Sequence, residues 1–301
     1  MQQQPPHDTY VKPPRKRKVT PARLRRMMLQ LGKELYHRAR YDPGKARQVL
    51  FIVGCQRSGT SMVTHIFEED WDTKVYPEVS KLSSQDLPRK LRLNPLARVK
   101  AELDKDRAPL IILKPLVESQ NTPLLLDYFP NSKALWLYRD YKAVARSHVN
   151  KWTGQNSIRD LKAIVDQTPN NWRYENVSDA LRDIVVQYFS RDIDGYEASA
   201  LYWFVRNRLF FDLQLDQEPR VMLCRYETLA QHPVRIMKKI YDFIERDFPG
   251  SRIVAEVNVD AVDKGRDINL APAIDQVCRN LLAQLDAISA RQYAPVDIAT
   301  I

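Results

Sequence analysis

The sequence predicts an α/β fold, a single domain in which a central parallel sheet is flanked by helices. Four continuous apolar runs are typical of strands covered on both faces, and an amphipathic helical pattern follows each run. This strand–helix order builds a doubly wound parallel sheet. The 301 residues, 44% hydrophobic and 28% charged, are enough for one such domain. The predicted strands are residues 48–54, 109–114, 133–139 and 220–227, and the predicted helices are 59–69, 121–129, 140–152 and 233–246.

Further helical patterns surround this core. Residues 178–216 predict a long insertion of two helices before the last strand, and residues 272–290 predict one more amphipathic helix. Another helix is predicted ahead of the first strand, over residues 21–41, because Pro21 is favoured at a first helical position.

The net charge of +10 is concentrated at the N-terminus. Residues 1–50 hold 13 Lys/Arg and 3 Asp/Glu, whereas the rest of the chain holds 34 of each. A nucleic-acid-binding domain would carry positive charge on its folded part, so no nucleic-acid partner is expected. The composition divides the chain into a disordered basic tail at 1–20, a basic amphipathic helix segment at 21–47 and one domain at 48–301.

The predicted N-terminal helix has one apolar face and one basic face. Two arrangements are open at this point. The helix lies on an anionic membrane surface or a partner, with peripheral contact through residues 12–40, or it docks on the core with its basic face in solvent. The apolar face is formed by Leu24, Met27, Met28, Leu31 and Leu35.

The lack of a secretory or membrane-spanning pattern, together with the cysteine usage, indicates a cytoplasmic protein. It would be peripheral to a membrane if the N-terminal helix binds one. No run of 18 or more apolar residues is present, and residues 1–18, MQQQPPHDTYVKPPRKRK, lack the apolar core of a secretory signal. Cys55, Cys224 and Cys278 do not have the spacing of metal ligands, so we expect buried, reduced thiols.

The stretch VLFIVGCQRSGTSMVTHIF, residues 49–67, has the outline of a phosphate-binding loop between a strand and a helix. Four residues separate Gly54 from Gly59, and two hydroxyl residues follow. A nucleotide hydrolase carries lysine at the position of Thr60, and that lysine reaches the β- and γ-phosphates. Without it, the loop predicts a cradle for a single anion; the alternative is a plain strand-to-helix turn.

The chemistry of this loop fits an anion at the start of the helix. Its backbone N–H groups converge at the positive end of the helix dipole, the hydroxyl groups add donors, and an arginine adds a charged fork for two oxygens. The candidate binding residues are Arg57, Ser58, Gly59, Thr60 and Ser61.

A second constellation follows the third predicted strand, in ALWLYRDYKAVARSHVNKW at residues 134–152. Arg139 ends that strand, and Ser147 lies eight residues along the next helix, or about 12 Å at 1.5 Å per residue. The two side chains can share a phosphate only if it lies alongside this helix. Otherwise they are an interfacial arginine and an ordinary helix serine.

Together these two motifs resemble the family of sulfotransferases that use 3′-phosphoadenosine-5′-phosphosulfate (PAPS). QRSGTS is similar to the family's 5′-phosphosulfate loop, and YRDYKAVARS is similar to its 3′-phosphate site. The resemblance covers about residues 48–290. It implies a P-loop-like sulfotransferase fold, PAPS as donor substrate held at the loop, a 3′-phosphate held by Arg139 and Ser147, and an adenine contact from Tyr226 in the later stretch VMLCRYETL.

The chain departs from the family's cytosolic small-molecule members in two places. Those members carry Lys before the Ser-Gly of the loop and Trp after it, whereas this chain has Arg57 and Met62. They also carry a catalytic His just after the second strand, where this chain reads Lys114-Pro115-Leu116. The general base must therefore come from another residue.

The best candidate for the base is Glu78, in TKVYPEVSK, 21 residues after Arg57. In the family's glycan and tyrosyl-protein branches a Glu in this segment acts as base, and the resemblance implies the same role here. A base must reach the acceptor hydroxyl to remove its proton. The alternatives are that Glu78 is a solvated carboxylate or a partner of Lys81, and that His65, inside the loop helix, is the base.

Lys114, at the end of the second predicted strand, is the second catalytic candidate. A cation there would neutralise charge on the bridging oxygen as its bond to sulfur breaks. The alternative is a surface lysine. A sulfuryl group carries less charge than a phosphoryl group, and no pair of Asp residues is placed to hold Mg²⁺, so no metal is expected.

These observations leave three hypotheses. The first is an enzyme that transfers a sulfuryl group from PAPS to a hydroxyl, with a Glu base. The rivals are a P-loop kinase or nucleotide hydrolase, and a non-catalytic nucleotide-binding scaffold docked on a membrane. The pocket wall is expected from residues 79–108 and 153–200, and the basic stretch KLSSQDLPRKLRLNPLARVK favours a glycan or glycolipid acceptor over a steroid, with a peptide tyrosine as second choice.

Overall fold

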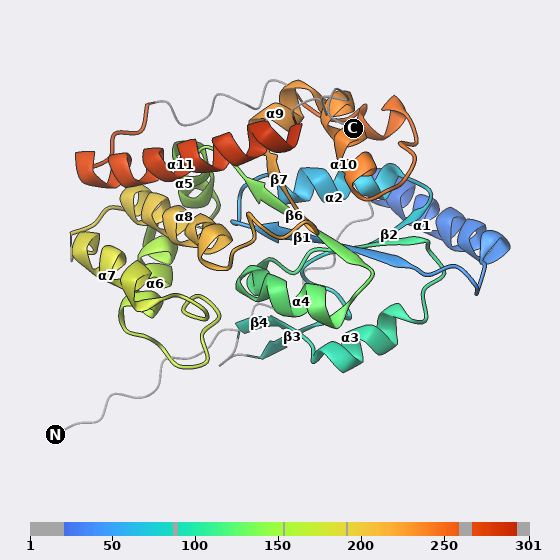
Figure 1. Ribbon diagram of the computed structural model, residues 1–301, viewed down its shortest axis with the longest axis horizontal. Coiled ribbons are helices and arrows are strands. Elements are labelled where there is room, and N and C mark those ends of the chain that lie inside the picture. The colour runs from blue at the N-terminus through green and yellow to red at the C-terminus, as the bar shows by residue number, and fades with distance from the viewer. Residues whose placement is uncertain (1–20, 87–89, 153, 191, 259–266, 294–301) are drawn as a thin grey trace, which may run out of the picture.

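The computed structural model describes residues 21–86, 90–152, 154–190, 192–258 and 267–293. Its centre is a five-stranded parallel sheet in the order β2-β5-β1-β6-β7, with helices on both faces (Figure 1). The α/β prediction is therefore confirmed. The strands of the sheet are β1 (Gln48–Gly54), β2 (Thr73–Tyr76), β5 (Leu110–Leu113), β6 (Ser132–Tyr138) and β7 (Val221–Arg225).

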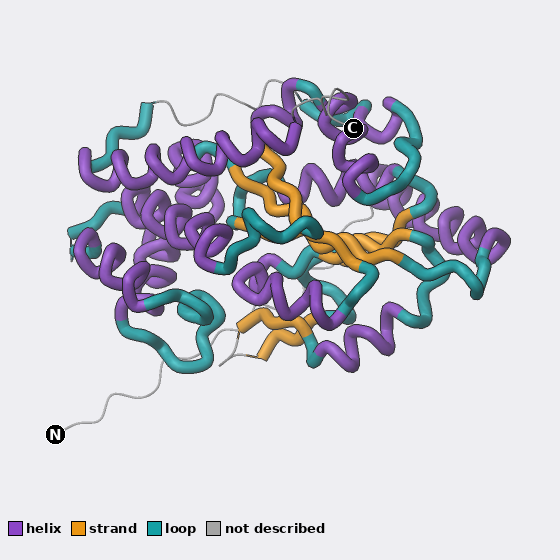
Figure 2. The backbone as a smooth tube through the Cα atoms, in the orientation of Figure 1, coloured by secondary structure: helices purple, strands orange, loops and turns teal. Residues whose placement is uncertain are grey.

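The two faces of the sheet are buried in two separate hydrophobic cores, as the continuous apolar runs require. On β1, Leu50 and Ile52 pack with α2 and α10, whereas Phe51 and Val53 pack with α4, α5, α8 and α11. Figure 2 shows the sheet enclosed between these helices. The bounds are α2 (Thr60–Glu69), α4 (Thr122–Tyr128), α5 (Tyr141–Trp152), α8 (Gly195–Asp212), α10 (Pro233–Phe243) and α11 (Pro272–Tyr293).

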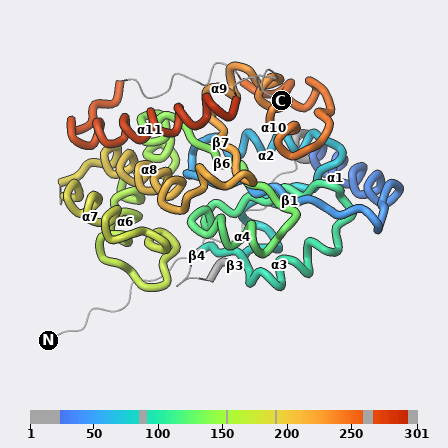
Figure 3. Tube along the Cα trace, in the orientation of Figure 1, coloured from blue at the N-terminus to red at the C-terminus, as the bar shows by residue number. Residues whose placement is uncertain are grey.

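All four predicted strands and the helices after them are present within one or two residues of the expected bounds, except that α10 ends three residues early. The expected insertion contains α7 and α8. Helix α11, far from α8 in sequence, runs beside α8 and β7 (Figure 3). The bounds of α7 are Asp179–Tyr188. The sequence did not predict several other elements, most of them short. These are the strands β2, β3 (Ser83–Asp86) and β4 (Lys90–Leu93), the helices α3 (Leu96–Leu103), α6 (Gly154–Val165) and α9 (Tyr226–Gln231), and the turns η1 (Leu116–Asn121) and η2 (Ser251–Val254).

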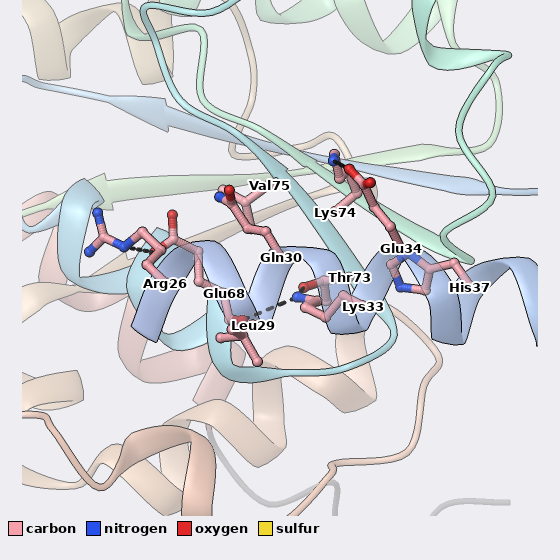
Figure 4. Close-up of a pocket in the computed structure, with 10 residues that line it drawn as sticks. All are labelled: Arg26, Leu29, Gln30, Lys33, Glu34, His37, Glu68, Thr73, Lys74 and Val75. Carbon is pink, nitrogen blue, oxygen red and sulfur yellow. Dashed lines mark hydrogen bonds and ion pairs between the residues drawn. The ribbon is translucent and has the colours of Figure 1, made fainter. Parts of the chain in front are cut away.

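The N-terminal helix, α1 (Pro21–Arg40), docks on the domain beside α2 and β2, but not through its apolar face. Lys33 and His37 are buried in the contact, while the predicted apolar face points to solvent. Lys33 and His37 find backbone and hydroxyl oxygens there (Figure 4), and the ring of Tyr36 packs edge-on against Trp71 beside them. In the described part of the chain, no helix combines the length and apolar character that crossing a membrane requires. The predicted tail at 1–20 lies outside the described residues.

Candidate active site

The loop between β1 and α2 depends on its two glycines. Gly54 and Gly59 have positive φ angles of 114° and 88°. A Cβ on Gly54 would lie 2.3 Å from the carbonyl oxygen of Leu137, and one on Gly59 would lie 2.2 Å from the ring of Tyr226. Only glycine fits at these two positions, because the loop backbone runs against β6 on one side and against Tyr226 on the other. The loop therefore meets the ends of β6 and β7 directly.

Helix α2 begins at Thr60, and no side chain caps its N-terminus. Its first-turn N–H groups and the positive end of its dipole are therefore directed at the loop, which is the arrangement that binds anions at helix N-termini. Ser58 and Thr60 are buried within the turn, and Ser61 accepts a hydrogen bond of 3.3 Å from Lys114 Nζ.

Arg57 connects the loop to the helix that follows β6. Its Nε donates a 2.9 Å hydrogen bond to Ser147 Oγ, across 90 residues of sequence. Arg57 has a φ of 68°, unusual for a residue other than glycine and often found where a site constrains the backbone. Burial, and then the nearby charge of Arg139, lower the pKa of Arg57. Two guanidinium groups close enough to repel each other favour an anion between them.

Arg139 is held in place from three sides. Its guanidinium lies 4.1 Å above the centre of the Tyr226 ring, and its Nε is 3.7 Å from the Glu227 carboxylate. The backbone carbonyl of Arg139 accepts a 2.9 Å hydrogen bond from Trp203 Nε1 on α8. These contacts fix the end of β6 and orient the cation toward the loop.

One open cavity of about 740 Å³ is lined by the side chains expected to bind the two ends of a nucleotide. Four cationic side chains line it, and among the described lining residues there is no carboxylate. Such a cavity suits a ligand with more than one phosphate. Its lining residues are Arg57, Arg139, Ala143, Arg146, Ser147, Asn150, Lys151 and Tyr226.

Glu78 and Lys114 lie on the other side of the loop. Burial raises the pKa of Glu78, and the charges of Lys114 and Arg206 oppose that rise. Burial likewise lowers the pKa of Lys114, and the charge of Glu78 opposes that change. The two groups are thus electrostatically coupled in a partly desolvated place. Lys81, the alternative partner of Glu78, instead forms a 3.0 Å ion pair with Glu102.

Glu78 also lines a second cavity, of about 620 Å³, whose walls are aromatic and polar. The tryptophans Trp152 and Trp172 lie on this wall, and Trp152 is also 5.5 Å from the Arg57 guanidinium, so it lies between the two cavities. Most of the wall comes from the expected range 153–200 and its flanks, not from 79–108. The lining residues are Gln56, Glu78, Val117, His148, Trp152, Asn156, Arg159, Asp160, Trp172, Arg173 and Tyr202.

Two histidines near these cavities differ in their surroundings. His148 is buried on α5, and its Nδ1 is 2.8 Å from Ser157 Oγ. Burial, followed by the charges of Arg57 and Arg173, lowers the pKa of His148 to about 4, so the ring is neutral near pH 7. His65 instead lies on the side of α2 that faces α1, where its ring nitrogens contact Arg26 and Glu68 at 2.8 Å each.

Sequence reasoning missed several residues that support this site, some buried and one, Trp152, exposed. Arg206 on α8 is completely buried, and its guanidinium donates to Gln120 Oε1 at 3.1 Å. The sequence did carry a signal for Arg206, because an arginine within the apolar run ALYWFVRNRL is expected to be buried, and arginine is rarely buried unless it is paired. Trp152 and Glu227 carried no comparable signal.

Comparison with known proteins identifies the family. The family described as the sulfotransferase domain matches residues 47–266. The chain superposes on the sulfotransferase domain from the curacin biosynthetic pathway with a TM-score of 0.55 at 16% identity, covering 81% of this chain and 99% of that one. The sulfotransferase domain of the Synechococcus PCC 7002 olefin synthase gives 0.49 at 16%, covering 82% and 98%, and mouse sulfotransferase SULT7A1 complexed with PAP gives 0.42 at 15%, covering 84% and 88%. No curated protein matches the chain.

The chain therefore belongs to the PAPS-dependent sulfotransferase family and is a transferase enzyme. Members of this family take the sulfuryl group from PAPS and pass it to an acceptor hydroxyl. Among the described residues, no group of three or more His, Cys, Asp or Glu side chains is placed to hold a metal ion.

Proposed function

We propose that this enzyme transfers a sulfuryl group from PAPS to a hydroxyl of a glycan or glycolipid, with Glu78 as general base. One observation carries the proposal: Arg57, Arg139, Ser147 and Tyr226 line a single cation-rich cavity at the loop. Glu78 lies in the adjoining cavity with the coupled cation Lys114 beside it.

In this proposal the donor spans the cation-rich cavity. The backbone N–H groups of residues 57–61, with the hydroxyls of Thr60 and Ser61, hold the 5′-phosphosulfate. Arg139 and Ser147 hold the 3′-phosphate. Tyr226 contacts the adenine, and its ring is already fixed by the Arg139 guanidinium 4.1 Å away.

Transfer itself is an in-line displacement at sulfur. The acceptor oxygen forms a bond to sulfur while the bond from sulfur to the bridging phosphate oxygen breaks. Glu78 receives the hydroxyl proton, and Lys114 stabilises the charge that develops on the bridging oxygen. The products are a sulfate ester and 3′-phosphoadenosine 5′-phosphate (PAP). The Lys114–Ser61 hydrogen bond of 3.3 Å supports this role, because it ties the cation to the first turn of α2.

The lining of the second cavity supports a carbohydrate acceptor. Trp152 and Trp172 offer apolar rings beside the polar side chains of Asn156 and Arg173. Sugars present both apolar C–H faces and hydroxyl groups, so they need such a combination. The hydroxyl of Tyr202 is buried without a hydrogen-bond partner among the described residues, which leaves a group for a ligand to satisfy.

The test is a transfer assay with radiolabelled PAPS over a panel of glycan, glycolipid, steroid and tyrosyl-peptide acceptors. Glu78→Gln should lower turnover about 10²- to 10⁴-fold without weakening PAP binding, because it removes only the base. Glu102→Gln, a surface carboxylate that pairs with Lys81, is the matched control and should leave turnover unchanged. Unaltered turnover in Glu78→Gln would remove Glu78 from the mechanism, and transfer confined to steroids would exclude the glycan acceptor.

The location of the enzyme is part of the same proposal. We place it in the cytoplasm, in peripheral contact with a membrane through residues 12–40. The support is the concentration of positive charge in the first 50 residues, where 13 Lys/Arg stand against 3 Asp/Glu.

A further inference from the structure

Helix α1 is oriented with its polar side toward the protein and its apolar side toward water. An amphipathic helix on a soluble domain normally buries the apolar stripe. Here five large apolar side chains at helical spacing form an outward stripe, which we call the α1 stripe. Its members and their exposed fractions are Leu24 at 50%, Met27 at 47%, Met28 at 65%, Leu31 at 62% and Leu35 at 66%.

Specific polar contacts hold the helix in this rotation. The Lys33 ammonium donates to the backbone carbonyl of Glu68 at 3.1 Å and to Thr73 Oγ1 at 3.0 Å, and His37 Nε2 lies 2.7 Å from the carbonyl oxygen of Trp71. Figure 4 shows Lys33 directed at Thr73, and the pair Glu34–Lys74 closing the same contact.

Ion pairs secure the N-terminal half of the helix against α2 and the segment after η2. Arg25 pairs with Glu69 and with Glu256, both at 3.0 Å, and Arg26 pairs with Glu68 at 3.5 Å. The rotation of α1 is thus fixed along most of its length. The stripe faces outward because these hydrogen bonds and ion pairs hold the opposite side of the helix against the domain.

This rotation is costly for the isolated protein. It buries a lysine, whose pKa falls to about 8 because it is desolvated, and it exposes a contiguous apolar patch. Turning the helix by half a turn would bury the stripe and return Lys33 to water. The hydrogen bonds of Lys33 offset the cost of its burial, but nothing within the described residues covers the stripe, and a partner that did so would remove that cost.

The charge around the stripe determines which partner fits. Within α1, Lys33 is buried in the docking contact and Arg25 and Arg26 are paired with glutamates, but Arg38 is exposed three residues beyond Leu35, on the same side of the helix. The segment directly before α1, residues 12–18, adds five Lys/Arg to the sequence. A second copy would bring these positive charges together. An anionic lipid surface would accept the apolar stripe and attract the charge around it.

We propose that the α1 stripe is a membrane-docking surface that inserts into the headgroup region of anionic bilayers. The inference refines the peripheral contact in the proposed function and does not depend on the transfer chemistry. The enzyme would lie on the membrane with α1 in the interface plane and the domain held above it through the Lys33 and His37 contacts.

The experiment measures cosedimentation of the full chain with vesicles of phosphatidylcholine, with and without phosphatidylserine. Wild type should bind the phosphatidylserine vesicles, less at high salt because the charges are screened. The triple variant Met28→Gln, Leu31→Gln, Leu35→Gln keeps the charge and should bind at least about tenfold more weakly. The matched control is Leu124→Gln, Val186→Gln, Val234→Gln, which removes three exposed apolar side chains elsewhere and should bind like wild type.

Two further readouts separate the possible failures. Unchanged thermal unfolding and unchanged PAP binding in the stripe variant show that the fold and the donor site are intact. No binding by wild type, or equal binding by the stripe variant, would overturn the proposal. Concentration-dependent dimerisation that the stripe variant abolishes, without vesicle binding, would assign the stripe to a second copy instead. Loss of transfer activity in Glu78→Gln with membrane binding retained would leave this inference standing.

Discussion

At the scale of single residues, Glu78 and Lys114 control each other's charge. Burial favours the neutral forms of both, and each charge partly restores the other. In the proposed role of general base, Glu78 is active only when it is ionised, so its environment would set the pH range of the reaction. Arg206 contributes to the same balance from the buried helix behind, because its charge also lowers the pKa of Glu78.

The first prediction concerns the acidic limb of the pH profile. Because burial raises the pKa of Glu78 above its ordinary 4.5, kcat/KM should fall with decreasing pH at a midpoint above that value. Lys114→Met removes the charge that opposes this rise, so the midpoint should move to still higher pH. Lys81→Met, which affects a lysine paired with Glu102, should leave the midpoint in place. A midpoint unmoved by Lys114→Met would show that the two groups are not coupled.

The second prediction concerns His148 and stability. Its folded pKa of about 4 is below the ordinary 6.5, so between these values the unfolded chain binds a proton that the native protein does not. The contribution of His148 to the free energy of unfolding is therefore fully present above about pH 6.5. It decreases toward pH 4, by up to about 3 kcal/mol. Denaturant unfolding from pH 7 to pH 4 should show a shallower decrease in His148→Gln than in wild type. Parallel curves for the two proteins would contradict the assignment.

At the scale of elements, the second cavity depends on a close crossing of α6 and α8. Each helix begins with a glycine, and a Cβ on Gly195 would lie 2.4 Å from the Cα of Gly154. The close approach brings Asn156 and Tyr202 to the same cavity wall. The position of this wall of the second cavity is therefore set by two glycines that do not themselves line it.

Gly195→Ala should accordingly destabilise the protein by about 1–3 kcal/mol, because the added methyl group separates the two helices. It should also raise KM for the acceptor more than it weakens PAP binding. Gly44→Ala is the control, since a Cβ there meets only a side-chain oxygen of Asp42 at 3.3 Å in an exposed turn. Its unfolding free energy should stay within about 0.5 kcal/mol of wild type. Equal effects of the two substitutions would show that the crossing is not tight.

At the scale of the whole molecule, the cation-rich cavity joins distant parts of the chain. The loop follows β1, Ser147 follows β6 and Tyr226 follows β7, and a ligand that touches all three holds them together. Ligands that bind only the native state stabilise it by mass action.

PAP at about 100 times its Kd should therefore add about 2.7 kcal/mol to the unfolding free energy and raise Tm. AMP, which lacks the 3′-phosphate, should give a smaller shift at the same concentration. Arg139→Ala should abolish the difference between the two nucleotides, whereas Lys105→Ala, a surface lysine paired with Glu102, should preserve it. Equal shifts by PAP and AMP in wild type would indicate that the cavity has no 3′-phosphate subsite.

The sequence by itself determined four of the sheet's five strands, most of the helices and the family. Those features are written in local patterns: uninterrupted apolar runs for β1, β5, β6 and β7, and two glycines at a fixed spacing between β1 and α2. The short edge strand β2 and the β3–β4 hairpin carry no such pattern, because partly exposed strands of four residues resemble loops in sequence.

Only the tertiary structure decided how these elements meet. The Arg57–Ser147 hydrogen bond joins residues 90 apart, and the wall of the second cavity is assembled largely from α5, α6 and α8. The rotation of α1 is the sharpest case, because its amphipathic pattern identifies the apolar face but leaves open whether that face packs on the core or on a membrane or partner. Hydrogen bonds from Lys33 and His37 turn that face away from the core. Periodicity determines which residues share a face, but the partners available on the neighbouring surface determine which face is buried.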